Sequence, residues 1–512
     1  MDNPIWQKIT KAVTSKVALA TFALLAYWEI YLSVAGSFFE ANRLLFGTSF
    51  VALLLLALQI ALTLYFGVSL FLSMRGGERP NGILALAGEL AVIAMGIAMP
   101  IIFYYGRATE AVTFLAVLPY FLVGLLVAVA LFVIAFVKKK VVAVIVVIAM
   151  TVLSVGGVAA GFALGGKFRI EEAPAVFDNG TDFSVVWCTS APSIGYMEYT
   201  HDGETYVLYD AEDGKYRTDS RVHTVRVPYE HLYGATYRVS AAKVKKNAAK
   251  NSVTGDFITS PNYRFASKIT GTSVKLLSVT DWHEDTTRLC KAAAACGEYD
   301  VLLMMGDAVR FVNEREDLID NVILPAGRIG GGVRPIVFAR GNHEPRGKYA
   351  SELKSMLGYD DYYFTATYGN LNLLVMDGGE DKADDDPKNG GLFVSEAYRD
   401  AELTAIEALP VPAGINLSVC HIPLFAPSET SPQYARFSAI LEKWNIKLEI
   451  AGHEHYLDLV HTAAFDTLVA GGPTDEDGFV ACRIDVTGDT CTITAMNDSG
   501  EIVRTYGPIS LK

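Results

Sequence analysis

The sequence predicts a multi-domain protein in which an α-helical transmembrane bundle precedes a β-sandwich and then an α/β domain. Three observations predict this order. Apolar residues make up 51% of the 512-residue chain, and their excess lies almost wholly before about residue 165. Short alternating runs with turn signals follow, and later in the chain apolar strands alternate with helical segments. We expect domain boundaries at residues 1–165, 171–265 and 272–512.

Five apolar stretches in the first region each reach the roughly 20 residues that a helix needs to cross a bilayer. They cover residues 17–36, 46–73, 82–105, 111–137 and 141–164. None has the polar stripe of a helix that packs on a soluble core. The sequence therefore predicts five membrane-spanning helices and a lipid bilayer as a partner.

The basic residues of the first region predict its orientation. Lys8, Lys11 and Lys16 precede the first stretch, two arginines separate the second from the third, and three consecutive lysines separate the fourth from the fifth. Cytoplasmic loops carry the excess of Lys and Arg. We expect a multi-pass protein of the cell membrane with a cytoplasmic N-terminus and an extracytoplasmic C-terminal region.

Charge and cysteine content exclude two classes of site. The net charge of −13 at pH 7 argues against nucleic acid as a partner, because phosphate backbones are bound by clustered Lys and Arg. The six cysteines include no Cys-x-x-Cys pair, which excludes a cysteine zinc site. Cys482 and Cys491 flank a predicted turn and could form a disulfide, although buried free thiols are the favoured interpretation.

Short runs of alternating apolar and polar residues, separated by turn signals, lie between about residues 174 and 264 and are typical of a β-sandwich. The clearest strands lie at 183–187, 196–199, 205–209, 223–227 and 236–239. We interpret His201, His223 and His231 as strand or surface residues, not as ligands.

The third region alternates between two kinds of element, which predicts layers of strands and helices. Candidate strands lie at 275–279, 301–305, 335–338, 371–376, 416–420 and 447–450. Helical patterns lie at 286–296, 314–323, 348–357, 395–409 and 434–444.

Polar clusters follow five of these strands directly, and they contain five of the nine histidines. The clusters are Asp281-Trp282-His283, Gly306-Asp307, Gly341-Asn342-His343-Glu344, His421 and Gly452-His453-Glu454-His455. Because ligands gather outside the carboxyl ends of strands in α/β sheets, all five could converge on one place. Carboxylate, imidazole and amide groups suit a pair of divalent or trivalent metal ions, and a shared carboxylate would hold two ions roughly 3.5–4 Å apart.

These motifs, in this order, resemble the signature of the calcineurin-like metallophosphoesterase superfamily over about residues 274–460. The resemblance implies a four-layer α/β/β/α domain with two metal ions. By position it implies one ion on Asp281, His283 and His455, and a second on Asn342, His421 and His453. Asp307 would bridge the two. His343 would be catalytic, as proton donor to the leaving oxygen or as a stabiliser of transition-state charge.

A second resemblance concerns the sandwich. Trp187, His223 and Tyr237 lie in a pattern similar to the fibronectin-III-like domain that precedes the catalytic domain of purple acid phosphatases. Those enzymes carry a tyrosine three positions after the bridging aspartate and lack the histidine of the first motif. Here Arg310 and His283 stand at these positions. We therefore expect no phenolate ligand, and iron, zinc and manganese all remain open as the metals.

The resemblance implies hydrolysis of phosphate esters by metal-bound hydroxide, with phosphomonoesters favoured. The basic residues of the first region would place this reaction on the extracytoplasmic side. Phosphodiesters, nucleotides and lipid phosphates are alternative substrates. Arg310, Arg340 and Arg346 could bind a substrate phosphate or form salt bridges. The acidic stretch 380–386 is interpreted as a solvated loop.

A function of another class also remains open. Glu29 and Glu89 are ionisable residues within predicted spans, where a charge is costly unless it has a partner. They are compatible with a transporter or receptor whose external region binds phosphate ligands without hydrolysing them.

Overall fold

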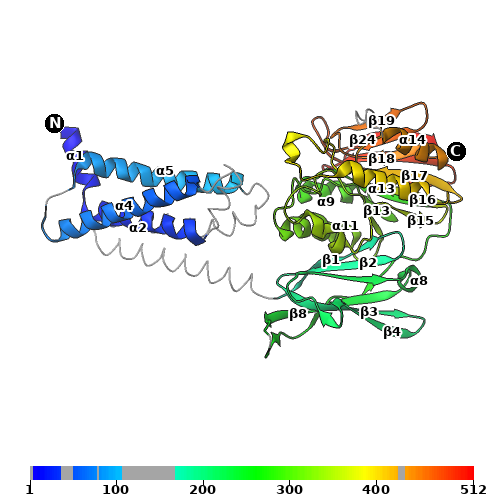
Figure 1. Ribbon diagram of the computed structural model, residues 1–512, viewed down its shortest axis with the longest axis horizontal. Coiled ribbons are helices and arrows are strands. Elements are labelled where there is room, and N and C mark those ends of the chain that lie inside the picture. The colour runs from blue at the N-terminus through cyan, green and yellow to red at the C-terminus, as the bar shows by residue number, and fades with distance from the viewer. Residues whose placement is uncertain (1–3, 36–49, 78–79, 107–167, 249, 425–432) are drawn as a thin grey trace. The chain divides into compact units, whose positions relative to one another are not determined.

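A computed structural model of the chain describes residues 4–35, 50–77, 80–106, 168–248, 250–424 and 433–512. The chain divides into two compact units, Met1–Lys167 and Phe168–Lys512 (Figure 1). Each unit is described by itself.

The described part of the first unit is helical. Its helices are α1 (Pro4–Val13), α2 (Lys16–Ala35), α4 (Phe50–Met74) and α5 (Gly82–Gly106). The predicted spans at 17–36, 46–73 and 82–105 fall on α2, α4 and α5, and those at 111–137 and 141–164 lie outside the described residues.

Among the described residues, the segment Leu53–Met74 is long and apolar enough to cross a membrane. A second span results if α1 and α2, which meet at a bend of 53°, are counted together. A five-helix transmembrane bundle therefore stays a prediction.

The second unit is built on two large sheets. The first runs in the order β24 (Ile502–Ser510), β23 (Thr490–Asn497), β22 (Gly478–Thr487), β12 (Ser273–Val279), β13 (Val301–Met304), β14 (Ile336–Phe338), β1 (Ile170–Asp178), β2 (Phe183–Thr189) and β7 (Val222–Val227). The other runs β15 (Phe364–Tyr368), β16 (Leu371–Met376), β17 (Ile415–Cys420), β18 (Leu448–Ala451), β20 (Asp466–Ala470) and β19 (Leu457–His461). In each sheet the strands that lead to the polar clusters run parallel to one another.

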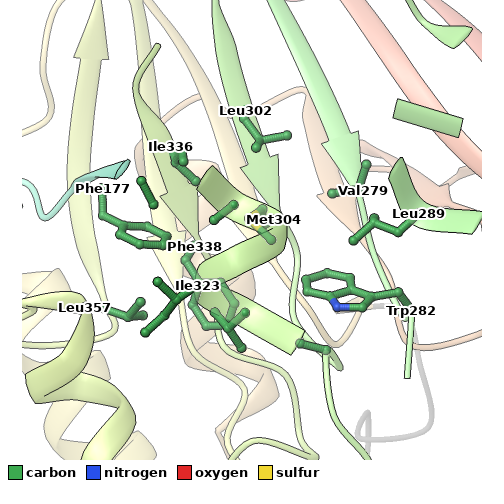
Figure 2. Packing of buried hydrophobic residues seen from close by; sticks show 14 of the residues in the cluster. Phe177, Val279, Trp282, Leu289, Leu302, Met304, Ile323, Ile336, Phe338 and Leu357 are labelled. Carbon is green, nitrogen blue, oxygen red and sulfur yellow. The ribbon is translucent and has the colours of Figure 1, made fainter. Parts of the chain in front are cut away.

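Alternate side chains of the parallel strands enter two different cores, because successive residues of a strand point to opposite faces. In β13, Val301 and Leu303 pack against the second sheet. Leu302 and Met304 pack against the helical layer that includes α9 (Thr286–Ala295) and α11 (Leu324–Gly330), as Figure 2 shows for part of this core.

The far face of the second sheet is covered by α13 (Ser395–Glu407) and α14 (Tyr434–Lys443). The unit thus has the four-layer α/β/β/α arrangement that the sequence resemblance implied.

The β-rich region before residue 265 is a sandwich, but its first sheet is not separate. Phe183, Trp187 and Tyr237 share a core between β1–β2–β7 and an antiparallel sheet of β3 (Ser193–His201), β4 (Glu204–Tyr209) and β8 (Thr236–Lys246). However, β1 also pairs in parallel with β14, with Phe177 opposite Ile336.

The predicted boundary between 265 and 272 therefore does not divide two sheets. Without β1, the three-residue strand β14 would end the sheet with unpaired backbone groups.

The six cysteines are all free thiols. Cys482 lies opposite Ala495 and Cys491 opposite Val486, so the two cysteines do not face each other across the β22–β23 hairpin. The favoured interpretation, buried free thiols, agrees with this geometry.

Candidate metal centre

The carboxyl ends of five strands from both sheets bring the seven predicted ligands together. Asp281 follows β12, Asp307 follows β13, and Asn342 follows β14. From the second sheet, His421 follows β17 directly, and His453 and His455 follow β18. Potential ligand atoms form three overlapping groups, each within 4.8 Å: Asp281–His283–His455, His283–Asp307–His343 and Asp307–His421–His453.

The distances within the ligand set suit chelation of single ions. Asp281 Oδ1 lies 3.2 Å from His455 Nε2, and His283 Nε2 lies 3.1 Å from the same nitrogen. On the other side, Asn342 Oδ1 lies 3.2 Å from His421 Nε2 and 3.0 Å from His453 Nδ1. Two ligand atoms that each lie about 2.1 Å from one ion are roughly 3 Å apart.

Asp307 lies between the two groups. One of its carboxylate oxygens, Oδ2, is 3.8 Å from His283 Nε2, and the other, Oδ1, is 3.3 Å from His421 Nε2. A carboxylate that faces one group with each oxygen has the geometry of a bridging ligand.

Two further observations indicate that these residues suit cations. Asp281 Oδ1 is buried and makes no well-aligned hydrogen bond among the described residues, although His455 Nε2 lies 3.2 Å away, whereas nearly all buried polar atoms make one. Burial alone would lower the pKa of His421, yet the adjacent Asp307 and Asp281 carboxylates raise it. The centre therefore favours positive charge, which metal ions would supply.

Hydrogen bonds aim the ring of His421 at the centre. Its Nδ1 donates to the carbonyl oxygen of Met305 at 2.6 Å. In the neutral ring this leaves the Nε2 lone pair facing Asn342 and Asp307, in the manner of metal-binding histidines with a fixed tautomer.

The loops that carry these ligands are strained. Asp281, His283, Asp307, His453 and His455 have φ values of 56°, 37°, 51°, 73° and 53°. Such left-handed conformations cost of order 1–3 kcal/mol for non-glycine residues and concentrate at functional sites.

Glu344 joins two of these loops. Its buried carboxylate accepts from the backbone N–H groups of Asp307, Ala308 and Gly341 at 3.0, 2.7 and 2.7 Å. At Gly306 (φ 79°), a side chain would overlap the backbone of Gly341, so the close approach of these loops requires glycine.

His343 lies beside the ligand set, with Nε2 3.7 Å from Asp307 Oδ2. Its Nδ1 donates to the carbonyl oxygen of Arg310 at 2.8 Å, and its Nε2 accepts from Arg346 Nη1 at 2.9 Å. The ring therefore has one defined orientation toward the centre.

The three arginines differ in their surroundings. Arg346 forms a two-pronged salt bridge with Glu380, at 2.7 and 2.5 Å, and Arg340 pairs with Asp377 at 2.7 Å. Both therefore form the salt bridges that the sequence left open. The Arg310 side chain is 61% exposed, and its Nε lies 3.9 Å from Glu284 Oε2.

The acidic stretch 380–386 contains residues that sequence reasoning missed. The solvated interpretation is wrong for Glu380, which is buried and paired with Arg346. Asp381 accepts from Asn342 Nδ2 at 3.2 Å, and thereby turns the amide oxygen of Asn342 toward His421 and His453. The sequence held one signal for the roles of Glu380 and Asp381, namely their position after the strand β16, at the same edge of the sheet as the ligands.

A Ser–His–Asp arrangement occurs in the sandwich. Ser193 Oγ is 2.7 Å from His223 Nε2, and His223 Nδ1 is 2.9 Å from Asp210 Oδ2. All three side chains are buried, so no substrate can reach the hydroxyl. His223 is thus a buried strand residue, in agreement with its interpretation from the sequence.

Comparison with known proteins gives a family for the region that holds these ligands. Residues 274–457 match the calcineurin-like phosphoesterase family. No curated protein sequence matches the chain.

Several solved structures match part of the chain. Purple acid phosphatase PPD1 from yellow lupin (Lupinus luteus) is 11% identical, with a TM-score of 0.45 over 65% of this chain and 74% of that chain. GAP50, the anchor in the inner membrane complex of Plasmodium, is 14% identical, with a TM-score of 0.36 over 47% of this chain and 90% of its own. Phosphopantetheinyl hydrolase from Mycobacterium tuberculosis is 14% identical, with a TM-score of 0.27 over 40% and 91%.

Proposed function

We propose, for a chain whose residues 274–457 form a calcineurin-like phosphoesterase domain, that it is a membrane-anchored hydrolase of phosphate monoesters. One observation supports this most strongly. Seven side chains of the ligand types that suit two cations converge at the sheet edge, with the Asp307 carboxylate between the two groups. Asp281, His283 and His455 would hold one ion, Asn342, His421 and His453 the second, and Asp307 both.

The bound ions would supply Lewis acidity that activates water at neutral pH and draws charge from the phosphoryl oxygens. The metals would be iron, zinc or manganese.

His343 would act on the leaving group. Its ring is fixed by Arg310 and Arg346 beside Asp307, so a phosphoryl group at the ligand set would lie within its reach. Nδ1 already donates to the Arg310 carbonyl, so Nε2 could donate only in a doubly protonated ring that has released its contact with Arg346. In that form a hydrogen bond or proton from Nε2 would stabilise the negative charge that develops on the leaving oxygen. The exposed guanidinium of Arg310 would contribute to binding of the substrate phosphate.

The location of the reaction follows from the basic residues of the first unit. The Lys and Arg distribution supports a cytoplasmic N-terminus, and five spans would place the second unit outside the cytoplasm. The substrate would be a phosphorylated small molecule or lipid that is present on that side of the bilayer.

The test measures metal content and hydrolysis of an aryl phosphate and a bis-aryl phosphodiester by the purified full chain. We expect about two metal ions per chain and faster hydrolysis of the monoester. Asp307→Asn and His455→Ala should lose metal and at least a hundredfold in kcat/KM.

His461→Ala provides the matched control, because His461 is exposed and pairs with Asp466; it should keep both properties. Absence of metal from the wild-type protein would refute the proposal. Two bound ions without turnover of either ester would favour the transporter or receptor alternative.

A further inference from the structure

A cavity of about 500 Å³ lies next to the candidate metal centre. Pro345 and Glu380 are part of its wall. Pro345 is two positions after His343, and Glu380 holds Arg346, which contacts His343 Nε2. None of the seven proposed ligands lines the cavity, and the Glu380–Arg346 pair lies between it and His343. The organic part of an ester bound at the ligand set would extend past this pair.

The charged residues of the cavity wall are paired within the protein. Arg340 binds Asp377 at 2.7 Å, Lys354 lies 3.9 Å from Asp361, and Glu380 binds Arg346 at 2.5 Å. The two buried charged groups of the wall, Arg340 and Glu380, are thus paired, and Lys354 and Asp361 are about half exposed to water. Such a wall favours an uncharged occupant, because an ion would lose its hydration without gaining a partner.

Apolar and aromatic side chains complete the wall. Leu392, Phe393 and Val394 form a rim along one side, and the Leu392 and Val394 residues are 86% and 73% exposed. Tyr362 and Tyr398 form the interior, with the Arg340 guanidinium 4.3 Å from the centre of the Tyr362 ring. Pockets for organic ligands are lined in this way.

Hydrogen bonds hold the rim in place. Asn389 Nδ2 donates to the carbonyl oxygen of Ala383 at 2.9 Å, and the Asp384 carboxylate accepts from the backbone N–H of Ser395 at 2.7 Å. Three consecutive apolar residues on a loop that is tied at both ends form a contiguous exposed patch, which indicates a site of contact with an apolar ligand.

We infer that this cavity, the rim pocket, binds the uncharged apolar group of an amphiphilic phosphate monoester, as a soluble alkyl ester or as a lipid phosphate. The inference rests on the proposed function and adds the substrate class. In the reaction the P–O bond to the organic group breaks and a water oxygen bonds to phosphorus. The oxygen of the departing alcohol takes a proton, and the alcohol leaves through the rim pocket.

The test compares methyl, butyl and hexyl phosphate as substrates of the full chain. The protein is held in nanodiscs, because detergent would compete for an apolar pocket. We expect kcat/KM to rise roughly threefold for each methylene that the pocket buries. Ser351→Trp, which fills the pocket from its exposed edge, and Leu392→Ser with Val394→Ser should each flatten this rise.

Val411→Ser is the matched control, since Val411 is an exposed valine that does not line the pocket; it should keep the wild-type rise. Equal kcat/KM for all three esters in the wild-type protein would overturn the inference and leave the proposed function intact. Hydrolysis of no ester at all would overturn the proposed function itself.

A second set of substrates distinguishes a lipid phosphate from a soluble alkyl ester as the source of the apolar group. Dihexanoyl phosphatidate is compared with glycerol phosphate, and hexyl phosphate with methyl phosphate. A larger gain for the first pair identifies a lipid as the source, and a larger gain for the second identifies a soluble ester. Either gain supports the rim pocket.

Discussion

At the scale of single residues, the ring of His343 shows how a side chain can be oriented without binding metal. Its two nitrogens have different partners, the Arg310 carbonyl at Nδ1 and the Arg346 guanidinium at Nε2. Its backbone N–H donates to Asp307 Oδ1 at 2.9 Å. The residue is therefore tied to the proposed bridging carboxylate by its main chain, and a substrate oxygen would reach Nε2 by displacing Arg346.

This geometry predicts that His343→Ala separates catalysis from metal binding. We expect two ions per chain to remain, because His343 is not among the proposed ligands, while kcat falls roughly 10²–10⁴-fold, as for loss of a general acid. Metal analysis and steady-state kinetics on the same preparation check both values. A variant that keeps wild-type kcat would refute the assigned role.

The convergence of the proposed ligands could be predicted from the sequence, and the residues that orient them could not. Each proposed ligand stands in a short motif at the end of an apolar strand, and both properties are local in sequence. Asp381 orients Asn342, and Glu380 holds Arg346, across gaps of more than thirty residues. Their roles depend on which loops of the folded sheet meet, and a run of acidic residues does not encode that.

At the scale of elements, the segment between β12 and α9 joins the core to the metal centre. Trp282 is buried in the helical layer of the core (Figure 2), and its indole N–H donates to the carbonyl oxygen of Asn321 at 2.7 Å. Its neighbours Asp281 and His283 carry ligand atoms. The buried indole therefore fixes the position of the two side chains that flank it.

Trp282→Ala should weaken both folding and metal binding. Removal of a buried tryptophan costs about 3–5 kcal/mol, so calorimetry should show a transition of the second unit at lower temperature, and the metal Kd should rise. Trp444 is the matched control, because it is also fully buried but lies in the outer helical layer of the second sheet. Trp444→Ala should lower stability with an unchanged metal Kd. Equal effects of the two substitutions on the Kd would contradict this account.

Elements of the second unit were largely predictable from pattern. The strands at 371–376 and 416–420 correspond to β16 and β17, and the helix at 395–409 to α13, because a continuous apolar run and a 3.6-residue period are strong local signals. Several strands, among them β1 and β22–β24, were not predicted by range. In β1, Glu171 and Glu172 are polar and the burial does not alternate, since the strand is covered on both faces only after it joins β14.

At the scale of the whole molecule, the sandwich and the α/β layers are one structure. The β1–β14 pairing makes their first sheets continuous, and Gly327 of α11 lies so close to β1 that a side chain there would overlap the carbonyl oxygen of Ala173. The buried Asp178 at the end of β1 accepts hydrogen bonds from Tyr229 and Tyr368, at 2.5 and 2.7 Å, one from each side of the predicted boundary.

We therefore expect a fragment of residues 168–512 to fold and stay soluble, and a fragment of residues 272–512 to aggregate. The shorter fragment exposes the edge of β14 and the apolar face of α11, so it should aggregate. The longer fragment should be soluble and should bind the same number of metal ions as the full chain. Size-exclusion chromatography with light scattering, followed by metal analysis, compares the two. A monodisperse, metal-binding 272–512 fragment would show that the sandwich is an independent module.

The place of β1 in the sheet also bears on how the protein is made. During vectorial synthesis, β1 and β2 leave the ribosome before the other strands of the second unit. The strand that joins them to the rest of their sheet, β14, is translated only after the remainder of the sandwich and two further strands. The central strand β12 pairs with β22, which is translated later still, near the C-terminus. Pairings between segments so distant in sequence form slowly. The sheet can therefore be completed only when β22 has been translated, near the end of synthesis.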